Sequence, residues 1–213
     1  MVNVIEAKSD FMHDVQISVM GGSDFTKRPF KDFIDVELIA QGFIEVGKVN
    51  GSLFFNQGTQ AFANGIEKAF GIINENDDAT WDNNLGFYHK GGVPYIVTQA
   101  YMKRLINDPS VRGAITAAFG LLNNGIKDTR GGNVGEPCRL IFVQKSGRTI
   151  VGKKADGTLV LATFNGVTGV SGLTGDQTVE LAKALGLTNA VCMDGGGSTF
   201  GSYKGVIFDD SDR

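Results

Sequence analysis

Residues 190–199 read Ala190-Val-Cys-Met-Asp-Gly-Gly-Gly-Ser-Thr199, and this stretch decides how the rest of the sequence is interpreted. Its first four residues predict a short buried strand that runs directly into Asp194, so the carboxylate should lie at the rim of a sheet, where loops build sites. Three consecutive glycines, Gly195, Gly196 and Gly197, allow a turn whose N–H groups form a concave nest for an anion. Ser198 and Thr199 add hydroxyl donors. The alternative is a tight turn in which Asp194 only braces the glycines through backbone N–H groups. Neither a P-loop nor a dinucleotide-binding glycine pattern is present.

The residues before this stretch predict one helix and three strands. Thr174 is the expected N-cap of a helix through about Leu185, and Gly186 supplies its C-terminal stop. Residues 139–143, 149–151 and 158–164 predict strands in antiparallel order, with hairpin turns at 145–147 and 155–157. The helix should pack its apolar stripe of Val179, Leu181, Ala182 and Leu185 on this sheet.

The first half of the chain is less regular. Residues 98–106 predict a helix that stops before Pro109, and residues 15–19 predict a strand. Residues 30–39 fit either a helix or a strand. Residues 46–55 are apolar around Asn50-Gly51, the residues that follow to Gly71 suggest loop with short strands, and the polar residues 74–84 predict a surface loop. With no internal repeat and no long linker, residues 1–213 are expected to form a single α+β domain, with a mixed, largely antiparallel sheet flanked by helices.

Composition excludes several classes of protein. The chain has 42% hydrophobic and 20% charged residues, typical of a globular protein with a core, and 30 glycines, roughly twice the average usage of about 7%. A net charge of -3 provides no general attraction to nucleic acid or to an anionic membrane. Cys138 and Cys192 are too few for a disulfide framework and are expected to be buried thiols. No signal peptide or membrane-length apolar run is seen, so a soluble, cytoplasmic protein is expected.

Four segments in order resemble the phosphodiester glycosidase domain family, which includes the lysosomal uncovering enzyme. Residues 173–198 are similar to its closing helix and Asp-Gly-Gly-Gly-Ser motif, and Val49-Asn-Gly-Ser-Leu-Phe-Phe55 is similar to its Ile-Asn-Gly-Gly-Phe-Phe. Gly120-Leu-Leu-Asn-Asn-Gly125 and Arg148-Thr-Ile-Val-Gly152 resemble two further motifs. This chain departs from the family by having Ser52 in place of a glycine and Thr199 in place of a serine.

The resemblance implies cleavage between the anomeric carbon of a sugar and a phosphate oxygen, through an oxocarbenium-like transition state. Phosphate is a weakly basic leaving group, so stabilising its charge matters more than protonating it. Arg148 is expected to hold phosphate oxygens with its planar fork, and Asp194 is the expected nucleophile or general base. The alternative for Arg148 is a surface arginine at a strand end.

Further residues are predicted to bind the ligand. Asn50 and Asn123 or Asn124 could contact sugar hydroxyls, although asparagine before glycine also forms turns. His89 could be an acid or a phosphate contact, with a solvated loop histidine as its alternative. His13, Asp176 and Trp81 are read as a surface residue, a helix charge and a loop anchor. The predicted ligand-binding set is Asn50, Gly51, Asn123, Gly195, Gly196, Gly197, Ser198, Thr199 and His89.

Two other functions stay open. The chain could be a non-catalytic binder that sequesters a sugar phosphate or nucleotide-like ligand in the same pocket, or a structural, virion-associated scaffold. The expected partner is a small glycosyl phosphodiester or nucleotide-sugar-like molecule, without nucleic acid or membrane, and a homo-oligomer is compatible with the sequence. The sequence identifies no cofactor with certainty. A divalent cation bound by Asp194 and asparagine oxygens is chemically reasonable, but no ligand spacing demands it. The sugar, its aglycone and the anomeric outcome are not specified.

Overall fold

Strands make up most of the regular structure, and in the part of the chain that is described every strand pair is antiparallel. The computed structural model describes residues 1–8, 40, 42, 47–57, 60–69, 72–75, 82–91, 93–128, 141–166 and 172–209. A six-stranded sheet has the order β1 (Val2–Ala7), β13 (Leu159–Phe164), β12 (Arg148–Lys154), β14 (Leu187–Cys192), β10 (Phe119–Asn123), β11 (Ile126–Lys127). A five-stranded sheet has the order β6 (Ile72–Glu75), β5 (Ile66–Ala69), β9 (Val111–Thr116), β7 (Leu85–Lys90), β8 (Val93–Thr98).

Smaller elements complete the described structure. A three-stranded sheet contains β16 (Val206–Asp209), β15 (Gly201–Tyr203) and β2 (Gly47–Val49), and β3 (Phe54–Gln57) pairs with β4 (Gln60–Ala63) as a hairpin. The helices are α2 (Gln99–Leu105) and α4 (Gly175–Ala184), with a 3₁₀ turn, η5 (Gly196–Ser198).

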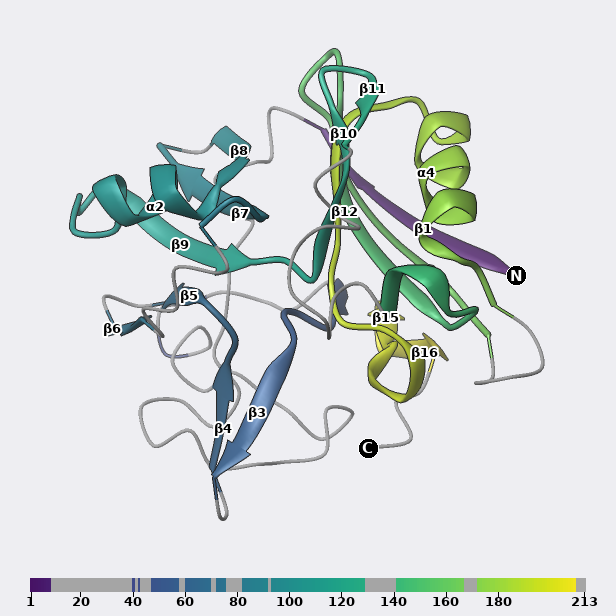
Figure 1. Cartoon of the computed structure of the whole chain (residues 1–213), viewed down its shortest axis with the longest axis horizontal. Helices are drawn as coiled ribbons and strands as arrows, with labels where there is room; N and C mark the ends of the chain where they lie inside the picture. The colour runs from purple at the N-terminus through teal and green to yellow at the C-terminus, as the bar shows by residue number, and fades with distance from the viewer. Residues whose placement is uncertain are drawn as a thin grey trace.

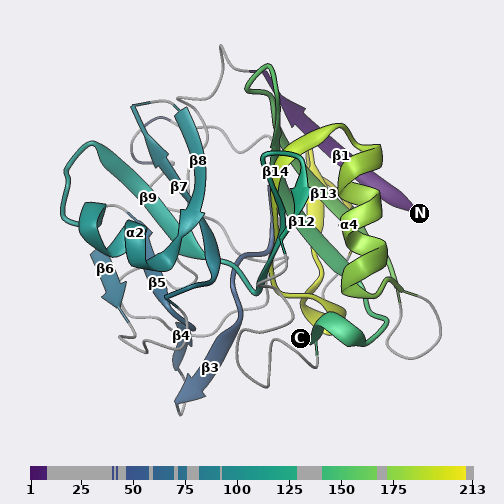
Figure 2. The same cartoon turned by 45° about the horizontal axis from the view of Figure 1, so that its top comes forward.

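The two large sheets face each other, and each carries one helix on its outer face (Figures 1 and 2). Between the sheets, an apolar cluster joins Leu85, Phe87, Ile115 and Ala117 of the five-stranded side to Val151, Leu159, Val191 and Met193 of the six-stranded side. Outside them, Met102 of α2 packs with Ile66 and Tyr88, and Val179 and Ala182 of α4 pack with Ile150 and Leu122. Because successive side chains of a strand point to opposite faces of the sheet, each strand can contribute both to the cluster between the sheets and to the cluster under its helix.

Both predicted helices are confirmed. Thr98 caps α2, with its side chain accepting from the Tyr101 N–H. Thr174 caps α4 in a capping box with Gln177, and Gly186 follows the helix at a φ of 76°. The antiparallel hairpin of β12 and β13 around Gly157 is also confirmed.

Two expectations about the sheets are wrong. Residues 141–143 are helical and not part of a strand, so 145–147 is not a hairpin turn; the carbonyls of Ile141 and Gln144 instead accept hydrogen bonds from Arg148. In place of a single mixed sheet, the described strands form two large antiparallel sheets, a three-stranded sheet and the β3–β4 hairpin. The chain crosses from β9 of one large sheet to β10 of the other through Ala117 and Ala118, both fully buried.

Several predicted features fall partly or wholly outside the described residues. The strand at 15–19, residues 30–39, His13, Trp81 and Cys138 all lie outside them. Of the predicted loop at 74–84, Asn74 and Glu75 belong to β6, and residues 76–81 are not described.

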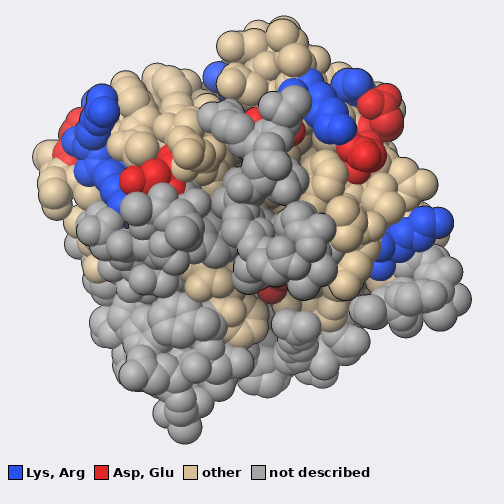
Figure 3. Space-filling view, in the orientation of Figure 1, with Lys and Arg blue, Asp and Glu red and all other residues tan. Residues whose placement is uncertain are grey.

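Charges of both signs lie close together on the surface in Figure 3, near α2 and near α4. Ion pairs such as Lys103 with Asp82 and Lys127 with Asp176 account for some of them. Among the helices described, none has the length and apolar character needed to cross a membrane.

Candidate functional site

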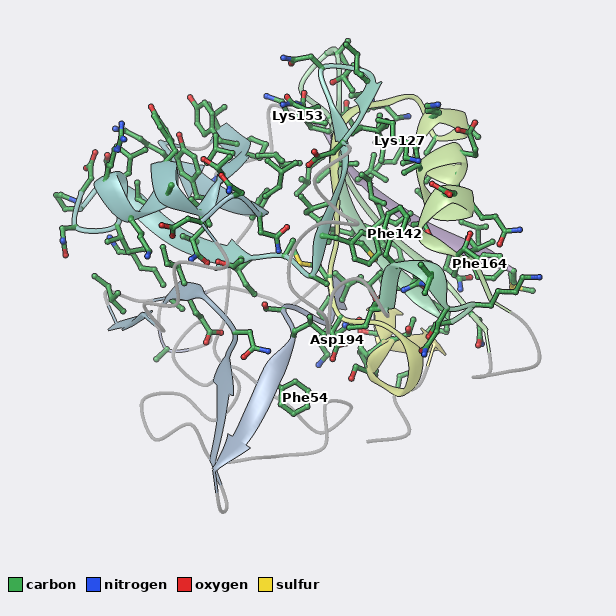
Figure 4. All side chains as sticks on the ribbon, in the orientation of Figure 1. Phe54, Lys127, Phe142, Lys153, Phe164 and Asp194 are labelled. Carbon is green, nitrogen blue, oxygen red and sulfur yellow. The ribbon has the colours of Figure 1, made fainter. Side chains whose placement is uncertain are left out.

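Asp194 lies two residues after the end of β14, and hydrogen bonds hold both its backbone N–H and its carbonyl. Its N–H donates to the Gly51 carbonyl at 2.9 Å, and its carbonyl accepts from Asn50 Nδ2 at 2.9 Å. The carboxylate Oδ1 accepts the Gly195 N–H at 2.8 Å, and the residue is only 7% exposed. Figure 4 shows Asp194 near the middle of the molecule. The expectation of an aspartate at the end of a buried strand is therefore confirmed.

Asn50 joins four segments of the chain. Its Oδ1 accepts from Thr149 Oγ1 at 2.5 Å and from the Phe200 N–H at 3.0 Å, while its Nδ2 donates to Asp194. Both acceptor positions of the amide oxygen are thus used within the protein. These contacts favour a positioning role for Asn50 over direct contact with a sugar.

The glycine turn packs against another backbone segment. The Gly196 N–H donates to the Gly147 carbonyl at 3.0 Å, and the Thr199 N–H donates to the Gly196 carbonyl, which closes η5. A Cβ placed on Gly195 would lie 2.5 Å from the Gly147 oxygen, so this close approach requires glycine. The N–H groups of Gly195 and Gly196 already have partners in the protein. In this conformation these two N–H groups are used within the protein, and the anion nest stays a prediction.

Arg148 lies at the start of β12 and is fully buried, so the surface-arginine alternative is wrong. Its Nε donates to the Leu173 carbonyl at 2.8 Å, and its Nη2 donates to the carbonyls of Ile141 and Gln144 at 2.7 and 2.5 Å. Burial lowers the pKa of its guanidinium. The third nitrogen, Nη1, is near Gly195 and has no hydrogen-bond partner among the described residues.

Three buried hydroxyls surround the same backbone segments. Ser52 Oγ, Ser198 Oγ and Thr199 Oγ1 make no hydrogen bond within the described part of the chain. Thr199 Oγ1 lies against Gly147, where a Cβ would be 2.6 Å away. Buried polar atoms are rarely left without partners, so these donors point to a bound ligand or water.

His89 and Asn123 are not among the residues that form the contacts described above. His89 is on β7, opposite Pro94 and Gly113, and is 1% exposed, so the solvated-loop alternative is wrong. Asn123 is exposed at the end of β10 and accepts from Asn189 Nδ2 at 3.5 Å. Because Asn189 lies five residues before Asp194 along β14, the structure does not bring Asn123 to the site. Asn124, at a φ of 51°, is the turn former that the alternative reading required.

Sequence reasoning missed Ser52, Thr149 and Gly147. Ser52 and Thr149 lie inside the quoted motifs, but nothing in their spacing indicated that Thr149 would reach Asn50, which is 99 residues away. Gly147 was assigned to a hairpin turn, and its contact with Gly195 depends on tertiary structure.

Among the described residues, no three histidines, cysteines, aspartates or glutamates are placed to hold a metal ion. Cys192, the residue two before Asp194, is a buried thiol as expected, and burial raises its pKa to about 11.

Comparison with known proteins shows the family of the chain. The model of the phosphodiester glycosidase family matches residues 44–211. Among curated proteins, the search finds no match.

Three solved structures share the fold. The zebrafish N-acetylglucosamine-1-phosphodiester alpha-N-acetylglucosaminidase catalytic domain, auto-inhibited by its pro-peptide, superposes with a TM-score of 0.61 at 20% identity, covering 98% of this chain and 64% of that one. A hypothetical protein from Synechocystis gives a TM-score of 0.58 at 11% identity, covering 99% of this chain and 54% of that one. A protein of Burkholderia pseudomallei described as exported gives 0.57 at 12% identity, covering 100% and 71%. The chain therefore spans less than two thirds of the length of the first two.

Proposed function

Because the chain belongs to the phosphodiester glycosidase family, we propose that it hydrolyses a glycosyl phosphodiester between the anomeric carbon and the phosphate oxygen. The observation that carries this proposal is a set of buried donors around Asp194, on Ser52, Ser198, Thr199 and Arg148, that have no hydrogen-bond partner among the described residues. Hydroxyl and guanidinium donors suit a ligand rich in acceptor oxygens, such as a sugar phosphate.

In the proposed reaction, Asp194 is the nucleophile. Its carboxylate bonds to the anomeric carbon while the bond from that carbon to the phosphate oxygen breaks, and the electron pair leaves with the phosphomonoester. The Gly195 N–H on Oδ1 fixes the orientation of the carboxylate. The hydroxyls of Ser198 and Thr199 stabilise the departing charge, in place of the glycine N–H groups, because those of Gly195 and Gly196 are bonded within the protein.

The test is phosphorus NMR of the full chain incubated with a panel of sugar-1-phosphodiesters and nucleotide sugars. We expect wild type to convert a diester to a monoester and Asp194→Asn to lose at least about 10²-fold in rate, typical for removal of one essential group. Circular dichroism should show that the variant remains folded. Asp176→Asn, on the exposed start of α4, is the matched control and should keep the wild-type rate.

Labelled water distinguishes the bond that breaks. Attack at carbon leaves heavy oxygen on the sugar. Label on the phosphate would show phosphodiesterase chemistry instead and would remove the glycosidase proposal.

A second candidate is a binder that sequesters the same class of ligand. The bonded N–H groups of Gly195 and Gly196 favour it, because the anion site then has fewer donors for a transition state. Binding without conversion in the same NMR samples, seen as line broadening of one compound, would identify this function. A single domain over 1–213 and a cytoplasmic location are also proposals, which limited proteolysis and cell fractionation would test.

A further inference from the structure

Ser52 has a buried hydroxyl to which the proposed reaction gives no role. The residue as a whole is half-buried, but its Oγ is shielded from solvent and makes no hydrogen bond among the described residues. A hydroxyl can donate one hydrogen bond and accept two, and buried polar atoms are rarely left without partners. An alanine would fill the same space without the cost of an unpaired hydroxyl. The hydroxyl therefore points to a ligand group that can bond to it.

Hydrogen bonds join the segment that contains Ser52 to Asp194. Asn50 Nδ2 donates to the Asp194 carbonyl at 2.9 Å, and the Asp194 N–H donates to the Gly51 carbonyl at 2.9 Å. That carbonyl belongs to the peptide unit that connects Gly51 to Ser52. The peptide unit of Ser52 is therefore in direct contact with the backbone of the candidate nucleophile.

The segment of Ser52 packs against the five-stranded sheet. A Cβ on Gly51 would lie 2.8 Å from Cδ1 of Ile115, which belongs to β9. The Leu53 carbonyl accepts at 2.8 Å from the N–H of Asn64, two residues before β5. The hydroxyl of Ser52 thus comes to the site from the side of this sheet.

Other buried donors come from the side of the six-stranded sheet. Arg148 begins β12, and its Nη1 is near Gly195. Thr199 Oγ1 lies against Gly147, the residue before β12. This group combines a cation with a hydroxyl that stabilises the departing phosphate in the proposed reaction. A neutral hydroxyl beside the nucleophile, on the side of the other sheet, suits the uncharged sugar.

We propose that Ser52 is a specificity-determining residue whose Oγ bonds to a hydroxyl or amide on the sugar carbon next to the anomeric carbon, an inference that rests on the proposed function. This substituent lies close to the nucleophile, because its carbon is bonded to the one that Asp194 attacks. Hydrogen bonds to a hydroxyl at this position strengthen in the transition state of glycoside cleavage. A site that bonds such a group rejects the analogue that lacks it, because the buried protein group is then left unpaired. The substrate class is therefore a sugar with a polar group on this carbon.

Ser52→Ala tests the hydrogen bond in combination with a change in the substrate. The probes are the methyl phosphodiesters of glucose, galactose and N-acetylglucosamine, and those of 2-deoxyglucose and 2-deoxygalactose, which lack the substituent, each as both anomers. We expect Ser52→Ala to lower kcat/KM about 10-fold for a probe that carries the substituent, as for the loss of one hydrogen bond. For the matching deoxy probe the change should be less than about 2-fold, because the bond is already absent. Phosphorus NMR follows each reaction.

Thermal denaturation without ligand gives a readout that does not depend on activity. Because the Ser52 hydroxyl has no partner within the described part of the chain, Ser52→Ala should melt at the same temperature as wild type or higher. A clearly lower melting temperature would show that the hydroxyl stabilises the fold, and would overturn the inference.

Ser110→Ala is the matched control, because Ser110 is exposed and donates its hydroxyl to Asp108. It should keep the wild-type kcat/KM for every probe. An equal loss in Ser52→Ala for both members of a probe pair, or no loss for either, would overturn the role of Ser52 alone. If wild type converts none of the probes, the proposed function is overturned, and this inference with it.

Discussion

At the scale of single residues, the amide of Asn50 holds the site together through three hydrogen bonds. Thr149 Oγ1, itself fully buried, supplies one of them at 2.5 Å. We expect Thr149→Val, which has nearly the same shape, to lower the free energy of unfolding by about 1–3 kcal/mol, because it removes a buried partner of Asn50. Urea denaturation would measure this loss. Thr149→Ser keeps the hydroxyl and should stay close to wild type, and an equal loss in both variants would show that the methyl group and not the hydrogen bond matters.

The hydrogen bond from Thr149 to Asn50 also leads to a prediction about activity. If Asn50 positions Asp194 and does not bind the sugar, Thr149→Val should lower kcat while leaving KM nearly unchanged. A rise in KM at constant kcat would indicate that Asn50 contacts the substrate.

At the scale of elements, α4 begins with Gly175, although glycine has a low helix propensity. Alanine is the better helix former by roughly 1 kcal/mol, so Gly175→Ala is stabilising on sequence grounds. In the structure, a Cβ on Gly175 would lie 2.3 Å from the ring of Phe142, which stands edge-on to Phe119 with centroids 5.2 Å apart. We therefore expect Gly175→Ala to destabilise the protein by about 1–3 kcal/mol through overpacking. Thermal denaturation measures whether Gly175→Ala raises or lowers the stability. The control is Lys183→Ala on the exposed face of the same helix, which should change the stability by less than about 0.5 kcal/mol. A raised melting temperature would show that Phe142 can move aside.

A helix or strand can be predicted from the sequence when the residues that determine it are close together along the chain. Thr174 with Gln177 and Gly186, and Thr98 with Pro109, mark both helices because caps act within one turn. The β12–β13 hairpin likewise follows from its turn at Gly157. The sequence of residues 141–143 predicts a strand, but these residues are helical. The buried Arg148 side chain donates hydrogen bonds to the carbonyls of Ile141 and Gln144, a tertiary contact that local sequence does not indicate. Asp194 and its strand follow from the sequence, but the pairing of Gly147 with the glycine turn does not, since it joins segments about 50 residues apart.

At the scale of the whole molecule, two buried acidic groups contribute to the response to alkaline pH. Burial raises the pKa of Cys192 from 9.0 to about 11 and that of Tyr88 from 10.0 to about 12. The folded protein therefore keeps these protons at pH values where the unfolded chain has released them. Stability from the thiol is present below about pH 9 and is lost as the pH rises toward 11, by up to about 1.4 kcal/mol per pH unit. Urea midpoints between pH 8 and 11 should decline less steeply for Cys192→Ala than for wild type, whatever the offset at neutral pH. Parallel declines would show that the thiol does not titrate in this range.

The hydrogen bond between Asn50 and Phe200 also bears on how the chain is made. It spans 150 residues, and the bond from Asn50 to Asp194 spans 144. At roughly 5–20 residues per second, a ribosome needs on the order of 10–30 s to pass from one partner to the other. During that interval the strands near Asn50 have none of these partners, and contacts of such long range fold slowly. The nascent chain should therefore depend on chaperones until Phe200 has left the ribosome, and the site should form later than the elements whose contacts are local.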